Sequence, residues 1–300
     1  MSLNLVNPFM KFASGGGGTP WTTASDNGFT SGGGASGTYA PQSAAQSYNG
    51  VTWATKTSQP AARSAGSGGG NSDTFIVMGG DTASSGSWGT SPQNSCYTYD
   101  GSGNSWTTEN NLNVSTNFCF GGGNVDTAII TGGTYSAIDT NQTWDGSNWT
   151  TQHPYPKGSR GGAGDGNAQD AIGAAGYDSS YFADSYTYDG SSWTSITNAP
   201  TDKMQGDSCS CGQSGTFISG YAPSGTAGSY MWDGSSWTQT SSSNFDHRAT
   251  WGGDKTFAFK VGTDSATTDS EYYDGSADTW TSSGTSTWTI RAANGSGGNT

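Results

Sequence analysis

A turn sequence that occurs six times constrains the fold of this chain more than any other feature. Its clearest copies read Tyr or Trp, then Asp-Gly-Ser, Ser or Asn, and Trp-Thr, at residues 144–150, 188–194 and 232–238. Looser copies begin at Tyr48, Tyr99 and Tyr273. Successive copies, counted at the Asp or at Asn49, are 51, 45, 44, 44 and 41 residues apart. A period in this range is typical of repeat architectures.

Each repeat predicts four short strands. A Gly-rich run, such as residues 63–71, is followed by an apolar segment closed by small residues, such as residues 75–80. The third strand ends in Tyr or Trp, and the fourth begins after the Asp-Gly turn, which is a hairpin signal because Gly accepts positive φ and Asp can bond its own backbone. Gly-rich strands can crowd around a narrow axis, and the aromatic rings can fill the gaps between neighbouring sheets. Radial repetition of four-stranded sheets predicts a β-propeller.

The two ends of the chain predict how many blades the propeller has. Residues 28–33 match the second strand of a repeat but have no first strand before them, whereas residues 291–300 match a first strand with nothing after it. Placing these segments side by side completes a blade. We therefore expect an all-β fold over residues 19–300, a six-bladed β-propeller of four-stranded antiparallel blades closed by the C-terminal strand joining the N-terminal blade.

Residues 1–18 do not belong to the repeat and predict an apolar docking arm. A flexible Gly hinge, residues 15–18, follows the arm's apolar side chains, which are Leu3, Leu5, Val6, Phe9, Met10 and Phe12. The arm could fold onto its own propeller or insert into another subunit or a larger assembly. It lacks a basic segment before an uninterrupted apolar run, so we expect no cleaved signal peptide. No run in the chain has the length of a membrane span.

Charge and composition exclude two classes of partner. The formal net charge is −13, and the ten Lys and Arg residues form no cluster, which argues against binding nucleic acid or an anionic membrane surface. The chain contains 49 Gly but also twelve Trp, fourteen Tyr and eleven Phe. Because disordered chains are poor in aromatic residues, these counts favour an ordered fold.

One face of the predicted propeller collects candidate ligand-binding residues. All arginines of the chain fall at or just before the first strand of a repeat, and they are Arg63, Arg160, Arg248 and Arg291. The connections between second and third strands open on the same face and carry Trp88, Tyr135, Tyr177, Tyr181 and Tyr221. Arginines suit a carboxylate or anionic glycan, and exposed aromatic rings suit an adhesive surface. The structural alternative is that the arginines bond between blades and the rings fold down onto them.

The sequence contains no clear pattern of metal-ligating or cofactor-binding residues. The four cysteines are expected to be small buried thiols, and they are Cys96, Cys119, Cys209 and Cys211. Residues 165–170 cluster oxygen atoms that could hold Ca²⁺, but the spacing and the Glu of an EF-hand loop are missing. We therefore expect no metal and no cofactor.

The chain lacks residues that known classes of propeller enzyme need, and no catalytic residue is predicted. A sialidase-like propeller would need a Glu beside an arginine, but the only Glu residues are Glu109 and Glu271. A copper oxidase of the galactose-oxidase type would need two His near paired Tyr, whereas His153 and His247 fall about two blades apart. We expect that the chain is not an enzyme; a propeller hydrolase or oxidase is the least favoured alternative.

The order of the motifs over about residues 20–300 resembles the kelch repeat. An apolar strand, a di-glycine such as Gly79-Gly80 or Gly132-Gly133, a Tyr-Asp, a Trp and an Arg follow one another. The later repeats depart from the di-glycine, with Ala175-Gly176, Ser219-Gly220 and Val261-Gly262. The Asp-Gly-Ser-Ser-Trp-Thr turns, the Gly-rich strands and the scarcity of charge are similar to kelch-like tail, fibre and capsid-associated virion proteins of marine bacteriophages.

This resemblance implies a non-enzymatic virion structural or adhesion protein. Residues 1–18 would anchor it to other virion proteins, in multiple copies, and the propeller would be displayed toward a glycan or protein of the host surface. The expected localisation is the virion. The alternative is a secreted or surface-bound bacterial carbohydrate-binding propeller.

Overall fold

The structure is a computed structural model that describes residues 28–34, 40–50, 52–83, 89–200, 204–209, 217–221, 228–244, 250–253, 257–262, 268–286 and 295–297. The predicted apolar arm, residues 1–18, lies outside the described residues, as does the boundary of the propeller at residue 19.

Strands are the only regular secondary structure of the described residues, and all pairings between them are antiparallel. In chain order they are β1 (Gly28–Ser31), β2 (Ala45–Tyr48), β3 (Trp53–Lys56), β4 (Ser67–Gly70), β5 (Thr74–Met78), β6 (Cys96–Asp100), β7 (Ser105–Thr108), β8 (Phe120–Gly123), β9 (Ala128–Thr131), β10 (Asn141–Trp144), β11 (Trp149–Thr151), β12 (Ala163–Gly166), β13 (Ala171–Asp178), β14 (Ser180–Tyr188), β15 (Trp193–Ile196), β16 (Met204–Cys209), β17 (Phe217–Tyr221), β18 (Ser229–Trp232), β19 (Trp237–Thr240), β20 (Thr250–Gly253), β21 (Phe257–Val261), β22 (Asp269–Asp274), β23 (Thr279–Thr285) and β24 (Gly295–Gly297).

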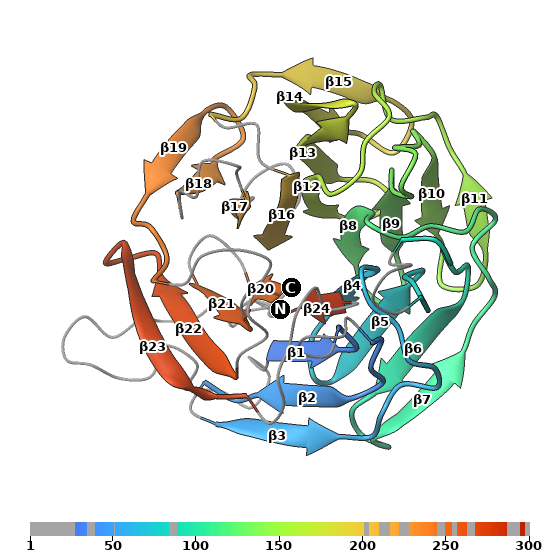
Figure 1. The fold of residues 1–300 in the computed structure, drawn as a ribbon, viewed down its shortest axis with the longest axis vertical. Helices are drawn as coiled ribbons and strands as arrows, with labels where there is room; N and C mark the ends of the chain where they lie inside the picture. Colours follow the sequence, from blue (N-terminus) through green and yellow to red (C-terminus); the bar gives the residue numbers. More distant parts are fainter. Residues whose placement is uncertain are drawn as a thin grey trace, which may run out of the picture.

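The strands of the described chain form four-stranded sheets arranged radially around a common axis (Figure 1). Consecutive strands make up the sheets β4–β7, β8–β11, β12–β15, β16–β19 and β20–β23. The remaining sheet has the order β24-β1-β2-β3, with Phe29 opposite Gly297. In Figure 1 the first strand of each sheet lies nearest the axis and the fourth lies at the rim. The prediction of an all-β propeller with four-stranded antiparallel blades is confirmed.

The recurring Asp-Gly sequence is the hairpin turn between the third and fourth strand of a blade. Oδ1 of Asp189 accepts hydrogen bonds from the backbone N–H groups of Ser191 and Ser192, both at 2.9 Å, and Gly190 has a φ of 91°. The backbone N–H of Ser192, together with the Ser191 hydroxyl and N–H, lowers the pKa of Asp189 to about 2. The residue type at each turn position therefore serves the turn geometry.

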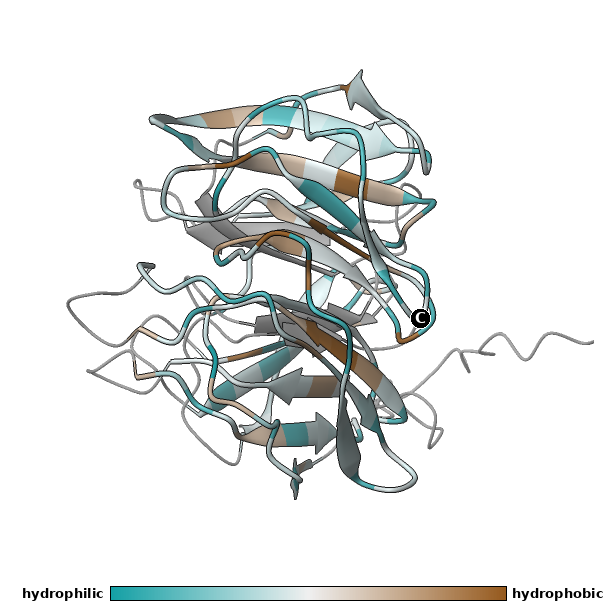
Figure 2. Ribbon diagram, turned by 90° about the vertical axis from the view of Figure 1, so that its right-hand side faces the viewer, coloured by the Kyte–Doolittle hydropathy of each residue, from teal (hydrophilic) through white to brown (hydrophobic). Residues whose placement is uncertain are grey.

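Aromatic rings on either side of this turn hold neighbouring blades together. The rings of Tyr188 and Trp193 lie 5.0 Å apart, and they pack with Ala171 against Ile129 of the preceding sheet. Comparable clusters, each drawn from two neighbouring sheets, occur at the other blade interfaces of the described chain. Burial of one such ring contributes roughly 4–6 kcal/mol as an upper bound. Strongly apolar segments are short and occur both in strands and in the connections between them (Figure 2).

The innermost strands approach one another too closely for side chains at some positions. A Cβ added to Gly69 of β4 would lie 2.3 Å from the carbonyl oxygen of Gly123 in β8. Glycine is required at Gly69 by this close approach, as the sequence predicts for a strand at the crowded axis.

Candidate functional site

The arginines of the predicted ligand face do not share one position of the repeat. The backbone N–H of Gly33 donates to the carbonyl oxygen of Arg63, and in a later repeat the N–H of Gly133 donates to that of Ser159. Arg63 is therefore equivalent to Ser159, and Arg160 is one residue further along. Neighbouring residues of an extended segment point to opposite sides. Arg63 and Arg160 therefore point to opposite sides, and the predicted basic patch, which also includes Arg248 and Arg291 outside the described residues, stays a prediction.

Arg63 is buried between blades and plays a structural part. Its side chain is 7% exposed. Nη2 donates to Oγ of Ser95 at 2.7 Å, and Nη1 donates to the carbonyl oxygen of Ala62 at 3.1 Å. Burial lowers the pKa of Arg63. This arginine follows the structural alternative, since it joins the connection after β3 to the connection before β6 in the next blade.

Arg160 instead lies between two tyrosine rings. Its guanidinium carbon is 4.0 Å from the ring centroid of Tyr135 and 4.6 Å from that of Tyr177. Nη1 donates to the carbonyl oxygen of Tyr135 at 2.8 Å. The ring of Tyr181 meets that of Tyr177 edge to face, with centroids 5.3 Å apart. We call Tyr135, Arg160, Tyr177 and Tyr181 the tyrosine–arginine stack; these four predicted face residues are brought together.

A turn positions Tyr135, and a β-hairpin positions Tyr177 and Tyr181. Tyr135 lies in the turn between β9 and β10, where Thr134 and Ala137 have left-handed φ values of 53° and 55°, and its side chain is 65% exposed. Tyr177 and Tyr181 were expected in a loop, but they are directly opposite each other in the long hairpin of β13 and β14. The strands continue past the bulge at residues 174–176, so the hairpin itself carries both rings.

Phe118 extends the tyrosine–arginine stack and was not predicted. A Cβ added to Gly89 would lie 2.9 Å from Cε2 of Phe118 and 2.9 Å from Cδ2 of Tyr135, so the two rings flank Gly89. Phe118 has a φ of 51°, which is unusual for a bulky residue. The equivalent residues of neighbouring repeats, Ala65 and Gly161, have φ values of 54° and 59°, so this conformation recurs in the repeat. A large aromatic just before the Gly-rich strand, where another repeat has Gly161, is the sequence signal that could have identified it.

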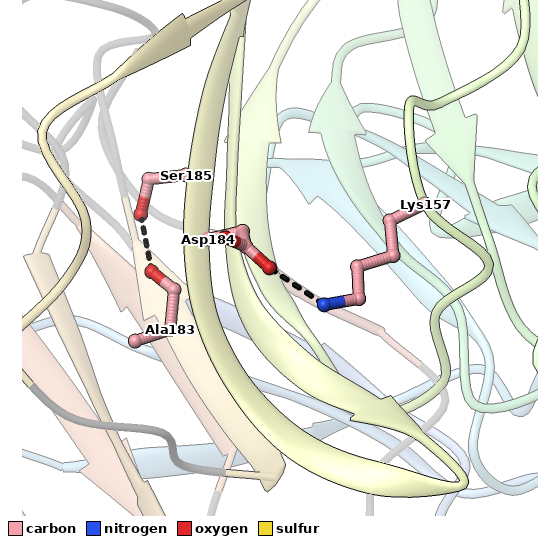
Figure 3. A network of polar contacts seen from close by, with 4 residues as sticks. All are labelled: Lys157, Ala183, Asp184 and Ser185. Carbon is pink, nitrogen blue, oxygen red and sulfur yellow. Dashed lines mark hydrogen bonds and ion pairs between the residues drawn. The ribbon is translucent and has the colours of Figure 1, made fainter.

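A second cation, Lys157, is already paired with Asp184 (Figure 3). Nζ of Lys157 lies 2.7 Å from Oδ2 of Asp184 and 4.2 Å from the ring centroid of Phe182. Both charged side chains are 35% exposed, so the pair contributes only about 0–1 kcal/mol to stability. Within the described ranges, no carboxylate forms an ion pair with Arg160.

Several predicted residues fall outside the described residues, or have side chains that do. They are Trp88, Tyr221, Arg248, Arg291, Cys209, Cys211 and the six apolar arm residues. Cys96 is buried and Cys119 is half-buried, and both are free thiols whose pKa burial raises to about 12. The prediction of a buried thiol is confirmed for Cys96.

The oxygen cluster at residues 165–170 is a hairpin turn between β12 and β13. Oδ1 of Asn167 accepts hydrogen bonds from the backbone N–H groups of Gln169, at 2.8 Å, and Asp170, at 3.1 Å. Asn71 makes the same pair of bonds between β4 and β5. No group of three or more metal-ligating side chains occurs in the part of the chain that the structure describes. The recurring turn accounts for the clustering of these residues.

Nor do the described residues contain a helix long and apolar enough to cross a membrane. In comparisons with known proteins, no protein-family model and no curated sequence matches the chain.

Proposed function

We propose that the chain is a non-enzymatic adhesion propeller that binds a surface carbohydrate at the tyrosine–arginine stack. The observation that carries this proposal is the ring of Tyr135, which is 65% exposed yet held against the guanidinium of Arg160. Rigid, exposed tyrosines give large contact area at low cost in conformational entropy. The apolar face of a sugar ring can stack on such a ring, while its hydroxyl groups reach neighbouring donors.

The same proposal includes the architecture of the ring and the attachment of the chain to a larger particle. We place the propeller in a kelch-like, six-bladed ring, and the pairing of β24 with β1 supports its closure. Residues 1–18 would anchor several copies to a phage particle, so that the propeller faces the host. If cross-links from residues 1–12 of the native assembly reach only the chain's own blades, the free secreted lectin is favoured instead.

A glycan array with the full chain and one matched pair of variants tests the binding. Tyr135→Ala removes the exposed ring, whereas Val114→Ala shortens another exposed apolar side chain, 37% exposed, which is not part of the stack and lies in the connection between β7 and β8. We expect bound glycans to be lost with Tyr135→Ala and kept with Val114→Ala. A wild-type chain that binds no glycan, or equal binding by both variants, would contradict carbohydrate binding at this site.

A further inference from the structure

We propose that the ligand of the tyrosine–arginine stack is a carboxylated sugar, such as a uronate or a sialate, and that Arg160 binds its carboxylate. This inference rests on the carbohydrate binding proposed above, and it adds the charge of the ligand and the residue that recognises it.

The guanidinium of Arg160 is planar and has five N–H donors. Among the described residues, only Nη1 donates a side-chain hydrogen bond, to the carbonyl oxygen of Tyr135. The rings of Tyr135 and Tyr177, at 4.0 and 4.6 Å, limit access to the group. The group is thus held in place with donors still available, and a carboxylate matches a guanidinium edge with two parallel hydrogen bonds.

Arg160 has no counter-ion among the described residues. Lys157 forms an ion pair with Asp184, whereas Arg160 forms none within the described ranges. Asp178 follows Tyr177 in β13, but it is opposite Ser180 while Tyr177 is opposite Tyr181. Because side chains alternate along a strand, Asp178 is on the other face of the hairpin from these rings.

The charge of Arg160 suits a singly charged ligand. The chain has a formal net charge of −13, which repels anions from most of its surface. One arginine without an ion pair among the described residues balances the one negative charge of a carboxylate. A phosphate group, with a charge of about −1.5 to −2, would need a second cation, and Lys157 is already paired with Asp184.

The test uses the full chain and oligosaccharides of glucuronate, galacturonate and sialate, each compared with its methyl ester by calorimetry. The ester keeps the sugar's stereochemistry and removes the negative charge, at the cost of one added methyl group. We expect the free acid to bind at least about tenfold more tightly than the ester for one of these sugars, with a preference that weakens as salt is added.

Three variants assign the preference to a residue. Arg160→Gln should abolish it, and Arg160→Lys should reduce it because the charge remains but the planar fork is lost. Lys157→Gln is the matched control and should leave it unchanged. Thermal unfolding checks that each variant is folded. If Arg160→Gln does not fold, the test uses Arg160→Lys instead, and its ratio of affinities for the free acid and the ester shows whether Arg160 binds the carboxylate.

The outcomes separate the two proposals. Equal affinity for acid and ester, or a preference that survives replacement of Arg160, overturns the carboxylate inference while carbohydrate binding stands. Failure of the wild-type chain to bind any acid, ester or neutral glycan overturns both.

Discussion

The Gly69→Ala substitution tests whether the propeller axis is as tightly packed as the structure indicates. The added Cβ would lie 2.3 Å from the carbonyl oxygen and 2.6 Å from the backbone nitrogen of Gly123. Ordinary contact begins near 3.4 Å, so the two strands must separate by about 1 Å. The obstructing atoms are backbone, and β8 is held by its pairing with β9. A side-chain rotation therefore cannot relieve the clash.

Overpacking of this kind costs typically about 1–3 kcal/mol, and occasionally more. We expect a loss of about 3 kcal/mol, because no flexible atom can move aside. With an unfolding entropy of about 2.1 cal/mol/K per residue, this loss lowers the Tm of a 300-residue chain by about 5 °C. Calorimetry or circular dichroism during heating measures the shift.

Gly103→Ala is the matched control for this experiment. Gly103 lies in an exposed turn, and its added Cβ would meet only side-chain atoms, Oγ of Ser105 at 3.0 Å and Oδ2 of Asp100 at 3.1 Å. Both substitutions reduce the freedom of the unfolded chain equally, so the difference between them isolates the packing term. If Gly69→Ala were within about 0.5 kcal/mol of Gly103→Ala, the tight packing of the inner strands would be refuted.

Three further predictions concern the ring, the arginines and acid stability. Deletion of residues 291–300 should lower the Tm, because it removes the partner of β1; an unchanged Tm would refute closure by this strand. Arg63→Met should destabilise the fold by about 1–3 kcal/mol through loss of the bond to Ser95, and glycan affinity should not change in a binding assay. Asp189 and Asp233 have pKa values lowered to about 2 from 3.8. Their contribution to stability is therefore present above about pH 4 and is lost as the pH falls toward 2. Combined Asp189→Asn and Asp233→Asn should make the acid-induced fall in Tm shallower, and an equal slope would contradict this.

The repeat pattern predicted the propeller because its turn residues act locally. Asp189 and Gly190 form the same turn wherever they occur, since the bonds run to residues two and three positions ahead. The aromatic residues before and after the turn were predicted to pack between blades for a similar reason. Their spacing places both rings on one side of a hairpin, and the clusters confirm this packing.

The candidate site was predicted only in part, because its details depend on register. Sequence spacing does not distinguish Arg63 from Arg160, since loops of different length precede the Gly-rich strand. A shift of one residue turns a side chain from the outside to the inside. Tyr177 and Tyr181 face each other because β13 and β14 extend past a bulge. Phe118 has a left-handed backbone at the position where another repeat has Gly161, and only that comparison between repeats could have identified it.

The pairing of β1 with β24 has a consequence for biosynthesis. Phe29 is opposite Gly297, so the partner of β1 is made 268 residues later. At translation rates of about 5–20 residues per second, roughly 13–54 s pass between the synthesis of β1 and the synthesis of β24. During that interval one edge of β1 offers unpaired backbone groups to any other nascent chain. Slower translation or crowded polysomes should therefore raise the yield of aggregated or strand-exchanged product, and the fully released chain should not share this vulnerability.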